Sequence, residues 1–164
     1  MARLKTLLSF PDPVNEVAAR VVAGAVVVMC AVTIALGQPW VIVALVYGFW
    51  ARVLTGPRLS PLGQLATRVV APRLAAPRRV PGPPKRFAQG MGVAFSTVAL
   101  VLWFGFSQHT VSLVLIGMLG TAASLESFLG YCLGCRTFAL LMKVGVIPEH
   151  FCMECVQVGV RRAA

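Results

Sequence analysis

Four cysteines near the end of the chain form two Cys-x-x-Cys pairs. Cys132 and Cys135 make the first pair, Cys152 and Cys155 make the second, and 16 residues lie between the pairs. This spacing is typical of a four-cysteine metal site. Because four thiolates satisfy the tetrahedral preference of zinc and leave no open position for a substrate, we predict a structural zinc site that organises a cap or a docking surface for a soluble partner. An iron–sulfur cluster is the alternative cofactor with the same ligands.

The first pair could instead act as a reactive dithiol, which requires a thiol whose pKa is lowered by a nearby cation or a helix N-terminus. Arg136 and a helix predicted over 137–144 favour negative charge on Cys135, whereas the end of the preceding helix opposes charge on Cys132. The alternative hypothesis is therefore a membrane thiol–disulfide or sulfur relay. In it Cys135 attacks, Cys132 resolves, and the partner is a thioredoxin-like or rhodanese-like protein.

The composition places these cysteines in a membrane protein. Hydrophobic residues make up 58% of the 164 residues and charged residues only 12%, and the mean hydropathy is +0.82. That balance excludes an ordinary soluble domain. The net charge of +10 alternates with segments too apolar to face water, so its expected partner is anionic lipid rather than nucleic acid.

Four apolar segments are long enough, or nearly so, to cross a bilayer core of about 30 Å as helices. They predict an all-α membrane protein with four transmembrane helices in two hairpins. The predicted domains are a transmembrane domain over 1–133 and a cysteine-rich cytoplasmic cap over 134–164. The helices are predicted over 17–36, 40–54, 87–106 and 111–133.

The basic residues predict the orientation of these helices. All 15 lysines and arginines lie outside the two short turns at 37–39 and 107–110. Because basic residues gather on the cytoplasmic side, both termini, the central basic loop over about 55–86 and the late cysteines are expected to be cytoplasmic, in a multi-pass protein of the inner or plasma membrane. Within the loop, a helix is predicted on the membrane surface over 60–71, followed by extended proline-rich chain from Pro72 to Lys85.

Glu126 is an ionisable residue inside the fourth apolar segment. Because an intramembrane carboxylate is costly unless it has a partner, we expect it to pair with Arg20, Arg52 or Arg86 and to serve assembly. A proton or ion pathway is the alternative role.

Small residues in the fourth segment indicate close helix packing. Gly117 and Gly120 allow helix backbones to approach each other. Cys30, unpaired in the middle of the first helix, is expected to pack as a small apolar residue.

Three runs of sequence resemble a known family. The runs are GPRLSPLGQLATRVVAPRL in the central loop, PPKRFAQGMG before the third helix and ESFLGYCLGC at the end of the fourth. They are similar to the small membrane proteins of the domain of unknown function 4395 family. The resemblance implies a membrane protein without an established activity, with Cys132 and Cys135 in the family's CLGC motif. It also implies that the second pair belongs to only part of the family, which favours the dithiol hypothesis.

Overall fold

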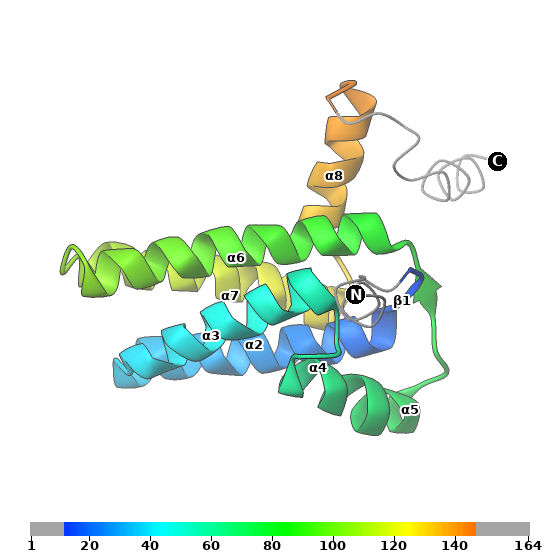
Figure 1. Ribbon diagram of the computed structural model, residues 1–164, viewed down its shortest axis with the longest axis horizontal. Coiled ribbons are helices and arrows are strands. Elements are labelled where there is room, and N and C mark those ends of the chain that lie inside the picture. The colour runs from blue at the N-terminus through cyan, green and yellow to red at the C-terminus, as the bar shows by residue number, and fades with distance from the viewer. Residues whose placement is uncertain (1–11, 147–164) are drawn as a thin grey trace, which may run out of the picture.

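The computed structural model describes residues 12–146, in which four long helices pack side by side and a further helix rises from one end (Figure 1). The two short turns lie at one end of this bundle, and the central segment (residues 56–81) and the base of the rising helix lie at the other (Figure 1). The all-α fold and the two hairpins are therefore as predicted. The long helices are α2 (Glu16–Leu36), α3 (Pro39–Thr55), α6 (Gly82–Phe104) and α7 (His109–Leu129).

Apolar side chains face both the interior and the exterior of the bundle. The helices α2, α6 and α7 are long and apolar enough to cross a membrane, whereas α3 is shorter. Val28 and Val114 are 62% and 56% exposed on the outside of α2 and α7. Such exposed apolar faces indicate a membrane protein. The interior cluster consists of Val26, Cys30, Ile42, Leu45, Phe49, Ala99, Ile116, Leu119 and Ala123.

Close packing between α2 and α7 explains the small residues of the sequence. Cys30 is buried in the interior cluster, which confirms its predicted packing role. A Cβ added at Gly120 would lie 3.1 Å from the Cβ of Cys30, so glycine is what allows this approach. Gly117 has more room, since an added Cβ would lie 3.9 Å from the nearest atom, in Ile34.

Local signals set the ends of the first hairpin. The side chain of Asn15 accepts a hydrogen bond from the Val17 amide at 3.1 Å and caps the start of α2. Gly37 ends α2 in a left-handed conformation that glycine adopts without strain. Pro39 then begins α3, because a proline in the first turn of a helix needs no backbone hydrogen-bond partner.

The central segment is more helical than predicted. It forms α4 (Pro61–Leu65), a π-helical turn η1 (Ala66–Val70) and α5 (Ala71–Leu74), so the predicted end of the helix at Pro72 is wrong. A proline ring would clash with the carbonyl four residues earlier, and the wider π turn before Pro72 relieves this conflict. The side chain of Ser60 caps α4 by accepting from the Gly63 amide at 3.2 Å.

The start of α6 also differs from the prediction. It lies at Gly82, so residues 82–86 are helical rather than extended, with prolines again in the first turn. Just before it, β2 (Arg79–Val80) pairs antiparallel with β1 (Val14–Asn15) and joins the central segment to the start of α2.

The fourth long helix ends before the cysteines. Gly130 adopts a left-handed conformation after Leu129, and α8 (Leu133–Lys143) turns away from the bundle axis (Figure 1). The prediction that the fourth helix ends at 133 and that the next helix begins at 137 is therefore wrong. The ring centroids of Phe87 and Phe138 lie 5.6 Å apart and hold α8 against α6. The predicted cap over 134–164 lies largely outside the described residues.

Candidate functional site

The first cysteine pair occupies the N-terminus of α8. Cys132 is the N-cap residue, and its Sγ accepts a hydrogen bond from the Cys135 amide at 3.4 Å. Cys132 is buried and Cys135 half-buried, and both are free thiols. Because the N-terminus of a helix carries partial positive charge, this position stabilises a thiolate on Cys132.

The surroundings of the two sulfurs separate their acidities. The pKa of Cys132 is lowered chiefly by a hydrogen bond with the Cys135 side chain, with help from the Lys85 charge and against the effects of burial and Glu126. The pKa of Cys135 is raised, because its proton is held by Cys132 and its thiolate would be poorly solvated. This geometry favours Cys132 as the thiolate. It favours the opposite order to the expected one, in which Cys135 attacks, because α8 begins at Leu133 rather than at 137.

Glu126 lies beside this pair and forms an ion pair with Lys85. The Nζ of Lys85 lies 2.6 Å from Oε1 of Glu126, and the side chains are 10% and 16% exposed. A cationic partner is thus present as expected, but it is Lys85 rather than one of the three arginines. Lys85 lies in the first turn of α6, which begins at Gly82, and its ion pair with Glu126 shows that its side chain faces α7.

Two of the arginines considered as partners of Glu126 have other hydrogen bonds. Arg20 donates from Nε and Nη2 to the carbonyls of Ser127 and Phe128, at 3.1 and 3.0 Å, and so completes the end of α7. Arg52 donates from Nε to the side-chain oxygen of Gln89 at 3.0 Å. The negative charge of Glu126 nevertheless stabilises the positive charge of Arg52.

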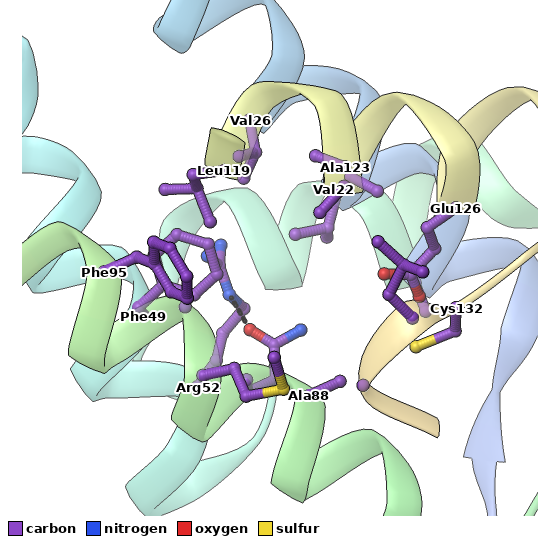
Figure 2. Close-up of a pocket in the computed structure, with 18 of the residues that line it drawn as sticks. Val22, Val26, Phe49, Arg52, Ala88, Phe95, Leu119, Ala123, Glu126 and Cys132 are labelled. Atoms are coloured by element: carbon purple, nitrogen blue, oxygen red, sulfur yellow. Dashed lines mark hydrogen bonds between the residues drawn. The ribbon is translucent and has the colours of Figure 1, made fainter. Parts of the chain in front are cut away.

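A cavity of about 190 Å³ lies between the bundle helices and reaches Cys132. Its lining is mostly apolar, with polar groups from Arg52, Gln89, Glu126 and Cys132. Glu126 and Cys132 lie on one side of this bundle cavity, and Arg52 and Phe49 lie on the other (Figure 2). No sequence pattern indicated the cavity, because its walls come from segments that are distant along the chain.

The metal hypothesis depends on residues outside the described range. Cys152 and Cys155 lie outside it, and residues 12–146 contain no cluster of three or more histidine, cysteine or acidic side chains that could hold a metal ion. Cys132 and Cys135 could supply two of the four thiolates that a zinc ion or an iron–sulfur cluster requires. Both cofactors therefore stay predictions.

The family model for a Domain of unknown function (DUF4395) matches residues 14–143. The chain belongs to this family. The region matched to DUF4395 begins at β1 and ends with α8, so it includes Cys132 and Cys135 and stops before the second pair. No curated protein and no solved structure matches the chain.

The lowered pKa of Cys132 predicts a pH profile for its alkylation. Because the thiolate persists as the pH falls below the pKa of an ordinary thiol, about 8.5, iodoacetamide should still react rapidly with Cys132 at neutral pH. Lys85→Met removes a stabilising cation and should shift the profile to higher pH. Mass spectrometry of the alkylated peptides measures both rates, and Lys143→Met is the control. A profile for Cys132 equal to that of free cysteine would contradict the assignment.

Proposed function

We propose that the protein is a membrane thiol–disulfide exchange protein in which Cys132 is the attacking thiolate and Cys135 the resolving thiol. The observation that carries this proposal is the place of Cys132 at the N-cap of α8, where its Sγ accepts a hydrogen bond from the Cys135 amide. A helix N-terminus with two cysteines three residues apart suits a dithiol, since one sulfur is activated and the other lies within reach.

The Cys132 thiolate attacks one sulfur of a partner disulfide, forms a mixed disulfide and releases a partner thiolate, which takes up a proton. Cys135 then loses its proton and attacks Sγ of Cys132, which releases the second partner thiolate. The partner gains two electrons, and Cys132 and Cys135 become a disulfide. The reverse steps oxidise a partner dithiol.

The proposal includes a topology with four spans and cytoplasmic termini. At 17 residues, α3 is about 25 Å long, which is near the lower limit for crossing the bilayer core. Its hairpin with α2 and the absence of basic residues from the short turns support this course. The basic central segment would lie against anionic lipid, and the cysteines would face a soluble thioredoxin-like protein. A rhodanese-like sulfur donor would use the same attacking thiolate.

A closed four-cysteine zinc site that ties a cytoplasmic cap together is the second candidate function. The spacing of the two Cys-x-x-Cys pairs favours it. The match to the family ends before Cys152, however, so a role shared by the family would rest on Cys132 and Cys135. Because the dithiol proposal needs only the first pair, the extent of the family match favours it over the zinc site.

Glutathione disulfide provides the test. With purified full-length protein, Cys135→Ser is expected to accumulate a mixed disulfide at Cys132, whereas Cys132→Ser should form none at residue 135. A Cys152→Ser/Cys155→Ser variant, which keeps only the first pair, should release two glutathione molecules per chain and form the Cys132–Cys135 disulfide. The wild type should form the same disulfide. Mass spectrometry distinguishes these products.

Two further results decide between the candidates and test the orientation. About one zinc per chain, lost in Cys152→Ser and accompanied by unreactive thiols, would overturn the exchange proposal in favour of the zinc site. Glutathione disulfide does not cross membranes readily, so inverted vesicles should form the Cys135→Ser adduct and right-side-out vesicles should not. The opposite sidedness would reject the proposed topology.

A further inference from the structure

The bundle cavity has the size and lining of a site for one ring. A dry apolar cavity of about 150 Å³ can hold a benzene molecule, and this cavity is about 190 Å³. It is not fully enclosed, so a ligand attached to a longer tail could enter it. Its apolar walls are Val22, Val26, Phe49, Phe95, Leu119 and Ala123.

Arg52 lines the cavity and carries a hydrogen-bond donor without a partner among the described residues. Its side chain lies with the guanidinium 4.6 Å from the centre of the Phe49 ring, and the residue is only 5% exposed. Nε donates to Gln89, but Nη1 finds no hydrogen-bond acceptor within the described part of the chain. Because an unsatisfied buried donor is costly, a ligand that offered Nη1 a hydrogen-bond acceptor would remove this cost.

The opposite side of the cavity carries a cysteine sulfur and a carboxylate. Cys132 lines the cavity together with Glu126, and the two lie across from Arg52 (Figure 2). Glu126 is held by Lys85 at 2.6 Å. A ligand that fills the cavity would therefore contact a guanidinium at one edge and a reactive sulfur at the other.

We propose that the bundle cavity binds the ring of a membrane quinone and that this quinone is the electron acceptor of the Cys132–Cys135 dithiol. One quinone carbonyl accepts a hydrogen bond from Nη1 of Arg52, and the ring packs on Phe49 with its other edge toward Cys132. A quinone combines an apolar six-membered ring, carbonyl acceptors and solubility in the bilayer. This inference rests on the proposed exchange function and gives it a direction, from a partner dithiol to the quinone.

The electrons and protons of this step balance. Cys132 as a thiolate and Cys135 as a thiol together lose two electrons and one proton when their sulfur–sulfur bond forms. The quinone takes the two electrons, the proton from Cys135 and one proton from solvent, and leaves as the quinol. A thioredoxin-like dithiol then reduces the new disulfide by exchange and restores the pair.

Decylubiquinone is a suitable probe, because all its ring carbons are substituted and do not readily add thiols. Reduced wild-type protein in lipid nanodiscs should bind it and convert one quinone to quinol per chain while the internal disulfide forms. Arg52→Met should weaken binding about tenfold or more, the expected effect of losing a charged hydrogen bond. Ala123→Phe, which fills the cavity, should weaken it as well. Arg73→Met removes an exposed charge on α5 and is the matched control, with unchanged binding.

Further results separate this inference from the exchange proposal. Cys132→Ser should bind decylubiquinone as the wild type does but should not reduce it. Equal binding by wild type, Arg52→Met and Ala123→Phe, all folded by thermal unfolding, would overturn the quinone site even if exchange with glutathione disulfide proceeds. Arg52-dependent binding of oleate without binding of decylubiquinone would overturn it in favour of a lipid carboxylate. Quinone binding without any thiol exchange would leave the ring site intact and reject the exchange proposal.

Discussion

Lys85→Met is expected to lower the free energy of unfolding by about 3 to 5 kcal/mol, the typical cost of removing one partner of a buried ion pair. Nζ of Lys85 lies 2.6 Å from Oε1 of Glu126, and both side chains are largely buried. The substitution leaves a buried carboxylate without its nearest cation. Glu126→Gln should be milder, at about 1 to 3 kcal/mol, because its amide oxygen can still accept from Nζ. Unfolding in detergent micelles measures both losses.

The double variant Lys85→Met/Glu126→Leu shows whether the loss comes from the pair. Replacing both partners by apolar residues is often close to neutral, so most of the stability lost in Lys85→Met should return. Lys143→Met, at an exposed position of α8, is the control and should change stability by no more than about 0.5 kcal/mol. Losses that simply add in the double variant would contradict a direct interaction.

Sequence patterns predicted the long helices because the signals for them are local. The apolar runs are continuous, and Asn15 and Gly37 mark the ends of α2 through contacts within a few residues. The errors in the central segment and at the start of α6 occurred at prolines. Pro72 and the prolines after Gly82 were read as helix breakers, yet a π turn accommodates the first and the opening turn of α6 accommodates the others.

The candidate site was predictable only in part. The Cys-x-x-Cys spacing is visible in the sequence, but the choice of Cys132 as the proposed attacking sulfur depends on where α8 begins. Gly130 was the available signal for that boundary, since a left-handed glycine commonly ends a helix. The contacts of Lys85 with Glu126 and of Arg52 with Gln89 join α6 to α7 and to α3. Such contacts depend on tertiary packing, which a single sequence does not reveal.

Gly134→Ala is expected to displace α8 from the bundle and to disrupt the dithiol site. An added Cβ at residue 134 would lie 2.5 Å from both Cα and Cβ of Ala88, and 3.2 Å from its backbone nitrogen. No side-chain rotation relieves a clash with backbone atoms, so α6 and α8 must separate. Overpacking of this kind costs about 1 to 3 kcal/mol, and occasionally more. Because Lys85 lies on α6, the separation should also move the alkylation profile of Cys132 toward that of an ordinary thiol.

The matched control for Gly134→Ala is Gly90→Ala, also a helical glycine near the site. An added Cβ at Gly90 meets nothing within 4 Å, so this change should be neutral or should stabilise α6 by up to about 1 kcal/mol. Ala88→Gly removes one of the clashing carbons and should rescue Gly134→Ala only in part, because Cα of residue 88 remains in place. Thermal unfolding measures the stability of these variants, and the pH profile of Cys132 alkylation measures the effect on the dithiol. Equal effects of Gly134→Ala and Gly90→Ala on both measurements would show that the close approach of α8 to α6 does not position the dithiol.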